Sequence, residues 1–136
     1  MLHYENVILF ILSKANQRVH GIFKSRLHQY GLTPMQCLIL HALFEEEGLS
    51  AGEIGRRLVL DSATLSGVLE RMADACWIMK KTAEDRRVLN ITLTSKARHY
   101  KDELLQEIAA LNDEILSPFR LEERLLLERM LNDLKQ

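Results

Sequence analysis

The sequence predicts a mainly α-helical fold with one small β-hairpin, and three observations support this fold class. Apolar residues recur at steps of three and four along most of the chain, as in helices that bury one face. Residues that favour helix starts, such as Ser, Thr, Asp and Pro, precede these stretches. The period changes to two near residues 88–93, which is typical of a half-buried strand.

Length and composition favour one folded domain over residues 1–136. Of these residues, 47% are hydrophobic and 27% are charged, which is ordinary for a domain with its own core. No apolar run reaches about 18 residues, so we expect no membrane partner. Residues 1–10 lack the pattern of a signal peptide, and two cysteines make no secreted disulfide framework. Together these observations favour the cytoplasm.

Two helices are expected before residue 48. The first ends near Gly31, because glycine favours the left-handed turn that closes a helix. Its apolar positions are Ile8, Ile11, Leu12, Ala15, Val19, Ile22, Phe23 and Tyr30. Thr33, Pro34 and Gln36 then match a capping box with proline in the first turn, so they predict the start of a second helix. This second helix ends before Gly48.

Two short helices are expected next. Ser50 and Glu53 repeat the capping-box pattern at the start of a helix over 50–58. Asp61 and Ser62 provide the next N-cap, for a helix over 62–75. The first of these helices is expected to bury Ile54 and Leu58, and the second runs through Leu65, Leu69 and Met72.

A hairpin follows. Leu89, Ile91 and Leu93 alternate with their neighbours, as in a strand that buries one face. Residues 78–82 can pair with this strand, and residues 83–87 form the turn between the two.

Two more helices complete the chain, and their apolar surface predicts a partner. Thr94 caps a long helix, and Ser117 with Pro118 separates it from a final helix. Residues 125–127 are three leucines, so the final helix is apolar on more than one side. An exposed surface of this kind favours aggregation unless a partner covers it. We therefore expect a two-fold symmetric homodimer formed by the terminal helices.

The distribution of charge is more informative than the net charge of −1. Residues 1–69 carry six basic and six acidic side chains. Residues 70–100 carry seven basic and four acidic side chains, whereas residues 101–136 carry five basic and nine acidic ones. A basic middle segment allows local phosphate binding in a chain that is not basic as a whole.

The two short helices and the hairpin together indicate a winged helix-turn-helix. In a helix-turn-helix, the second helix enters the major groove of DNA. The first turns of the helix over 62–75 offer short donors and acceptors that can reach phosphates and base edges. We expect DNA contacts from Ser62, Thr64, Leu65, Ser66, Gly67 and Arg71. The alternative is that these hydroxyl residues only cap the helix.

The hairpin provides a second candidate contact with DNA. A two-stranded ribbon whose tip carries arginine can enter a narrow minor groove, where the negative potential is concentrated. The candidates are Lys80, Lys81, Asp85, Arg86 and Arg87. Asp85 beside Arg87 can orient the guanidinium. The alternative is a solvated turn with weak local ion pairs.

Three segments of the sequence resemble the MarR family of bacterial transcriptional regulators. They are Ser62-Ala-Thr-Leu-Ser-Gly-Val-Leu-Glu-Arg71, Glu84-Asp-Arg-Arg87 and Ile91-Thr-Leu-Thr-Ser-Lys96, and Leu32-Thr-Pro-Met-Gln36 also fits. The resemblance implies a cytoplasmic homodimer that binds a pseudo-palindromic operator in double-stranded DNA. It implies a DNA-binding lobe over 32–94, with dimerisation helices over 1–31 and 95–136. Many members are repressors released by a small ligand, often a phenolic or aromatic acid.

The chain departs from the family pattern at two informative positions. The family often has a basic residue where this chain has Gly67, so a base or phosphate contact is expected to differ. A glycine is usual where Cys76 stands, and glycine adopts a positive φ at little cost. Either the helix over 62–75 ends differently in this chain, or Cys76 carries backbone strain.

Other residues are weaker functional candidates. Arg18, His20 and His41 lie on helices that border the family's ligand pocket, so each is a candidate for an anionic effector, although an ordinary surface role is the simpler interpretation. A buried structural role is favoured for Cys37, and a reactive thiol is the alternative at Cys76. The histidines lack the spacing of a metal site, and no catalytic motif is present, so we expect no metal, no cofactor and no enzyme.

A second hypothesis is a helical dimeric adaptor that uses the winged fold to bind protein. The near-neutral charge is compatible with it. Salt dependence separates the two hypotheses, because binding to several DNA phosphates weakens steeply as salt rises.

Overall fold

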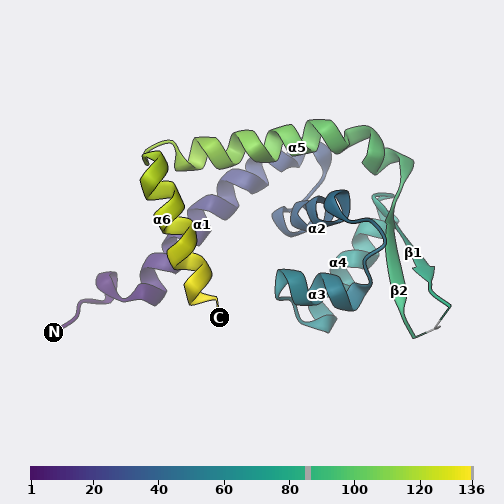
Figure 1. Ribbon diagram of the computed structural model, residues 1–136, viewed down its shortest axis with the longest axis horizontal. Helices are drawn as coiled ribbons and strands as arrows, with labels where there is room; N and C mark the ends of the chain where they lie inside the picture. The colour runs from purple at the N-terminus through teal and green to yellow at the C-terminus, as the bar shows by residue number, and fades with distance from the viewer. Residues whose placement is uncertain (85–86, 136) are drawn as a thin grey trace. The chain divides into compact units, whose positions relative to one another are not determined.

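The computed structural model describes residues 1–84 and 87–135. It has the predicted fold class: helices, with one two-stranded antiparallel hairpin (Figure 1). In chain order the elements are η1 (Tyr4–Asn6), α1 (Ile8–Leu27), η2 (His28–Tyr30), α2 (Pro34–Glu45), α3 (Ala51–Leu58), α4 (Ser62–Asp74), β1 (Ile78–Thr82), β2 (Leu89–Leu93), α5 (Ser95–Leu116) and α6 (Leu121–Leu134). None of the described helices is both long enough and apolar enough to cross a membrane.

The chain divides into two compact units, Met1–Leu105 and Gln106–Gln136. The first unit therefore contains the predicted winged lobe together with α1 and the first turns of α5. The second unit contains the end of α5 and all of α6.

Capping side chains set the helix starts that the sequence predicts. The Gln36 backbone N–H donates to Thr33 Oγ1 over 3.2 Å, and the Gln36 side chain accepts from the Thr33 N–H over 3.1 Å, so the capping box of α2 is complete. Ser50 Oγ accepts from the Glu53 N–H over 3.1 Å at the start of α3. Gly31, with φ of 68°, closes the turn that follows α1.

The core of the first unit is apolar and lies among α2, α3, α4 and the hairpin, which are grouped together in Figure 1. Two predicted core positions differ. Leu58 is half-buried, and Leu89 is 41% exposed, because it lies at the end of β2 that is farther from Leu93 and α5. The fully buried large side chains of this unit are Leu27, Ile39, Leu40, Leu43, Ile54, Met72, Trp77, Ile78, Ile91 and Leu104.

A third segment, residues 48–50, pairs with the hairpin, and the sequence did not predict this pairing. β1 pairs with one edge of β2, with Ile78 opposite Leu93. On the other edge, the Ile91 N–H donates to Leu49 O over 2.9 Å, and Ile91 O accepts from the Gly48 N–H over 3.0 Å. Ser50 adds an isolated bridge to Asn90. The segment after α2 therefore fixes the hairpin against the helices.

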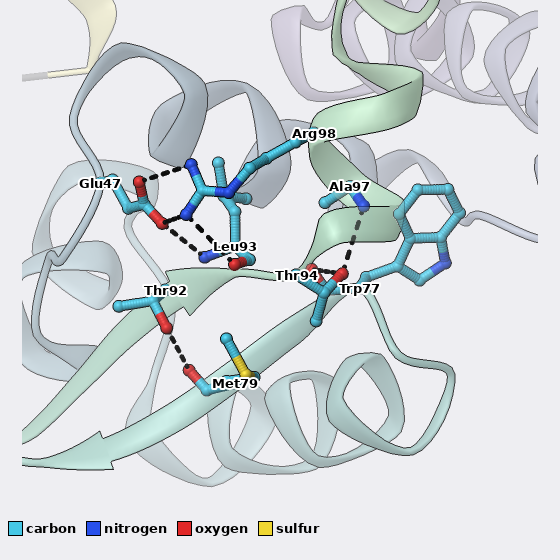
Figure 2. Close-up of polar contacts among 8 residues, drawn as sticks. All are labelled: Glu47, Trp77, Met79, Thr92, Leu93, Thr94, Ala97 and Arg98. Carbon is cyan, nitrogen blue, oxygen red and sulfur yellow. Dashed lines mark hydrogen bonds and ion pairs between the residues drawn. The ribbon is translucent and has the colours of Figure 1, made fainter.

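The start of α5 is joined to the end of α4. Thr94 Oγ1 accepts from the Ala97 N–H over 3.2 Å, which confirms Thr94 as the cap of α5 (Figure 2). The same hydroxyl donates to Cys76 O over 2.6 Å. Lys96 Nζ donates to Ala75 O over 2.9 Å and lies 4.3 Å from the centre of the Trp77 ring.

Glu47 forms a second junction between the lobe and α5. Its carboxylate accepts two hydrogen bonds from the Arg98 guanidinium and one from the Leu93 N–H, the last over 2.9 Å (Figure 2). These bonds hold the pKa of Glu47 below its ordinary value, with the Arg98 hydrogen bond as the largest cause. One carboxylate thus ties the loop after α2 to β2 and to the first turn of α5.

In the second unit, Arg124 of α6 lies 3.6 Å from Asp113 of α5. The Glu123 carboxylate accepts from the backbone N–H of Arg120 over 3.0 Å, which caps the start of α6. The large apolar side chains that α6 leaves exposed are Leu121, Leu125, Leu126, Met130, Leu131 and Leu134.

Candidate DNA-binding surface

The first turn of α4 is organised by Asp61. Its carboxylate accepts from both the backbone N–H and the hydroxyl of Thr64, each over 2.8 Å. These hydrogen bonds lower the pKa of Asp61, the backbone bond first. Because the Thr64 hydroxyl donates to Asp61, the group that Thr64 can offer to a base is mainly its methyl. Ser62 and Ser66 are exposed on the same helix.

The turn between α3 and α4 is unusually tight. Val59 has φ of 54°, which is left-handed backbone in a β-branched residue. The Leu60 N–H donates to Gly55 O over 2.9 Å. A Cβ at position 55 would lie 3.3 Å from Leu60 O and 3.4 Å from Leu65 Cδ2. Glycine at this position therefore allows α3 and α4 to pack closely.

A groove lies between this helix pair and the hairpin. It is a cavity of about 580 Å³, lined by residues of α3, the turn, α4, β1 and β2. Leu65, Leu69 and Leu89 supply apolar lining, and the polar lining includes Ser62 and Ser66. Two cations, Arg56 and Lys80, also line it.

The hairpin carries exposed cations both in this groove and beyond it. Lys80 and Lys81 are exposed on β1, and Arg87 is exposed just before β2. Asp85 and Arg86 lie outside the described residues. The lobe therefore brings the start of α4 and the hairpin positions Lys80 and Leu89 to one groove, with further basic residues on the hairpin.

Comparisons with known proteins agree with this architecture. The MarR family model matches residues 30–88. The transcriptional regulator TtmR of Methylorubrum extorquens is 41% identical over 101 residues, which are 74% of this chain and 52% of that protein. A crystal structure of a probable transcriptional regulator from Pseudomonas aeruginosa is 31% identical, with a TM-score of 0.90, over 97% of this chain and 99% of that one.

The chain belongs to the MarR family. Its relatives are transcriptional regulators, although the chain spans only about half the length of TtmR. The fold is also that of BpsR from Bordetella bronchiseptica, which is 23% identical, with a TM-score of 0.92, over 100% of this chain and 98% of that one. The DNA binding of BpsR is regulated by 6-hydroxynicotinic acid.

In this MarR-family chain, the DNA contacts predicted on α4, together with Lys80 of β1, fall into three groups. Ser62, Ser66 and Lys80 line the groove. Thr64, Gly67 and Arg71 lie at steps of three and four along α4, on a strip of its accessible face. Leu65 does not fit the prediction, because its side chain is only 4% exposed and packs into the interior. It is a core residue that borders the groove, and we do not propose it as a DNA contact.

The sequence analysis missed Arg56 as a candidate for this surface. Its Nη1 lies 3.6 Å from the place that a Cβ at Gly52 would take, so the side chain lies back along α3. Two arginines in the last turn of a short helix are also what a helix C-terminus favours. The sequence therefore could not separate the two roles, whereas the structure places Arg56 in the groove and Arg57 2.8 Å from Glu46.

The two cysteines of this MarR-family chain differ in environment. Cys37 is buried, and burial raises the pKa of its thiol to about 11, so little reactive thiolate is present at neutral pH. The buried role expected for Cys37 is confirmed. Cys76 is exposed and has φ of 65°, so the structure favours backbone strain over a different helix end, the two alternatives that the sequence left open.

One of the three effector candidates lines a second cavity in the first unit. This cavity, of about 410 Å³, is lined by His20 and Lys24 of α1, by His28 at the start of η2, and by residues 31–34 before and at the start of α2. Arg18 lies outside this lining, and His41 Nδ1 lies 3.2 Å from Glu45 Oε1. Lys24 and His28 follow His20 at steps of four, a spacing that the sequence analysis did not use.

Proposed function

We propose that this chain is a sequence-specific regulator of transcription that binds double-stranded DNA as a homodimer. The observation that carries the proposal is the groove in which the start of α4 meets the hairpin, with Ser62, Ser66, Arg56 and Lys80 in its lining. Short hydroxyl side chains and cations are the groups that position a protein on phosphates and read base edges.

Each lobe would place α4 in a major groove and the hairpin tip, with Arg87, in the adjacent minor groove. Two lobes related by a two-fold axis then meet two half-sites about 34 Å apart, one helical turn of DNA. The operator of such a dimer is a pseudo-palindrome, because each half-site meets the same surface.

Exposed apolar side chains on the terminal helices support the homodimer. α1 exposes Ile8, Leu9, Ile11 and Leu12, and α6 exposes Leu125, Leu126 and Leu131 among others. Apolar area left in water costs about 25 cal/mol per Å², so covering these side chains favours association. A second copy of the chain carries the same apolar side chains, so the two copies can cover each other in a two-fold symmetric dimer.

The test of DNA binding is selection of bound duplexes from a random pool by the full chain, followed by affinity measurements at several salt concentrations. We expect one pseudo-palindromic sequence to emerge, with log–log salt slope near −0.9 for each phosphate contact. Absence of duplex binding at every salt concentration would contradict the proposal and favour the adaptor hypothesis.

We further propose that the regulator is a repressor released by a small aromatic carboxylic acid. The cavity lined by His20, Lys24 and His28 has a size that suits such a ligand, and its basic side chains suit a carboxylate. The regulation of BpsR by 6-hydroxynicotinic acid supports this ligand class. A hundredfold change in operator affinity requires only about 2.7 kcal/mol of differential binding.

The effector test is a panel of aromatic acids and their coenzyme A thioesters, added to the complex of the full chain with its selected duplex. We expect at least one acid to release the duplex. Lys24→Ala should then raise the concentration needed for release and leave affinity without ligand unchanged. Arg18→Ala, on the same helix but outside the cavity lining, is the matched control and should behave like the unsubstituted protein. Equal effects of both variants would remove the cavity from the proposal.

A further inference from the structure

The accessible face of α4 carries an unusual strip, Thr64, Gly67 and Arg71. These residues follow one another at steps of three and four, so they lie in one row along the helix. The middle position has no side chain. Glycine in a helix interior costs about 0.5–1 kcal/mol relative to alanine, so local helix stability does not favour it there.

The guanidinium of Arg71 lies against Gly67, where a side chain longer than a methyl group would extend. Arg71 Nη1 lies 3.4 Å, and Nη2 4.0 Å, from the position that a Cβ at residue 67 would take. The side chain therefore lies back over the preceding turn, as long helical side chains do. Gly67 is half-buried although it lies on the accessible side of α4, consistent with this cover.

The environment of the guanidinium leaves it available for a ligand. Asp74 stands one turn further along α4, in position for an ion pair, but the Arg71 side chain extends in the opposite direction. Within the described part of the chain, no carboxylate forms an ion pair with Arg71. A planar cation with five donors thus lies on α4 one turn after Thr64.

We propose that Gly67 and Arg71 form one base-reading unit, in which the absence of a long side chain at position 67 gives the Arg71 guanidinium room to donate two hydrogen bonds to a single guanine. A guanidinium matches the O6 and N7 acceptors of guanine in the major groove. The missing side chain also lets the backbone of α4 approach the bases closely. This inference rests on the proposed DNA binding and makes Arg71 a specificity-determining residue.

The experiment compares duplex selection by the unsubstituted full chain with selection by four variants. Arg71→Ala should reduce discrimination at one symmetric pair of operator positions by about ten- to one-hundredfold. Arg71→Lys should lose the same discrimination and keep the salt slope, because lysine retains the charge but not the planar fork.

The two variants at position 67 test whether the position of the Arg71 guanidinium matters when its charge is kept. Gly67→Gln keeps Arg71 but fills the place of its guanidinium, so it should lose discrimination at the same positions. Gly67→Ala is the matched control, because a methyl group would meet Nη1 at an ordinary contact distance of 3.4 Å. It should keep the preference.

Three results would overturn the inference. In the first, Arg71→Ala weakens binding to all duplexes equally and lowers the salt slope by about 1, which identifies a phosphate contact. In the second, Gly67→Gln retains the full sequence preference. In the third, the unsubstituted chain selects no duplex from the pool. This result contradicts the proposed function itself, which distinguishes it from the other two.

Discussion

At the scale of single residues, left-handed backbone outside glycine lies at the two ends of α4 in the described part of the chain. Val59 precedes α4 and Cys76 follows it, and both adopt the left-handed region. This conformation costs an L-residue about 1–2 kcal/mol, because its Cβ approaches a carbonyl oxygen. The family pattern gave strain at Cys76 as one of two alternatives. No feature of the sequence pointed to Val59.

Replacing Cys76 with glycine should stabilise the protein. Cys76→Gly should raise the free energy of unfolding by about 0.5–1 kcal/mol, because glycine adopts φ of 65° without a Cβ clash but gains entropy in the unfolded chain. Urea unfolding at fixed protomer concentration measures this change. Cys76→Ala keeps the Cβ and removes the thiol, so it should change stability little. A gain from alanine as large as that from glycine would show that the thiol, not the backbone, is the cause.

Arg87 should contribute to operator binding and not to assembly. Arg87→Ala should weaken operator affinity about tenfold or more, because a charge-assisted contact is lost, while the dimer persists. Fluorescence anisotropy with the selected duplex measures affinity, and sedimentation measures assembly. Lys101→Ala, on α5, removes one positive charge elsewhere and is the control. Unchanged affinity in the Arg87 variant would exclude the hairpin tip from the proposed contact.

At the scale of elements, the signals that the sequence carries are local ones. The capping box of Thr33 and Gln36, the Asp61 cap and the Thr94 cap join residues three positions apart, so the pattern alone reveals them. The pairing of residues 48–50 with β2 joins positions about forty apart. Such a contact depends on tertiary structure and leaves no periodic signal in so short a segment.

Glu47 belongs to the same class of long-range contact. Glu47→Gln should lower the free energy of unfolding by about 1 kcal/mol, since the carboxylate loses charge-assisted bonds in a partly exposed site where water screens them. Chemical unfolding at pH 7 measures this loss. Glu46→Gln, whose carboxylate meets Arg57 in an exposed pair, should cost less.

The stabilisation from Glu47 should also depend on pH. Its pKa is lowered in the folded state, so folding favours the ionised form. The contribution is therefore complete above the ordinary glutamate pKa and is lost as pH falls through the lowered pKa of the folded state. The stability difference between the unsubstituted protein and Glu47→Gln should shrink as pH falls from 7 through this window. A difference that stays constant would contradict the assignment of the pKa shift to these bonds.

At the scale of the whole molecule, the apolar faces of the terminal helices should control assembly. Leu125→Glu should yield monomers at micromolar concentrations, because it places a charge on a face that the proposed dimer buries. Operator affinity should fall with it, since a monomer meets one half-site. Light scattering and anisotropy measure the two effects.

Leu38→Glu is the matched control for this prediction. Leu38 is 48% exposed and Leu125 is 59% exposed, but Leu38 lies on α2 rather than on a terminal helix. This variant should remain a dimer. Monomers in both variants would indicate a general effect of lost apolar surface rather than a specific interface.

The sequence by itself determined the element order, most helix starts and the position of the hairpin, because helical period and capping depend on residues within one or two turns. It also placed Ser62, Ser66 and Lys80 among the candidates that the groove brings together. Tertiary structure alone decided that Leu65 is core, that Arg56 joins the groove and that Arg71 covers Gly67. The direction in which a side chain points, and what it meets there, depends on packing between distant segments, which local sequence does not encode.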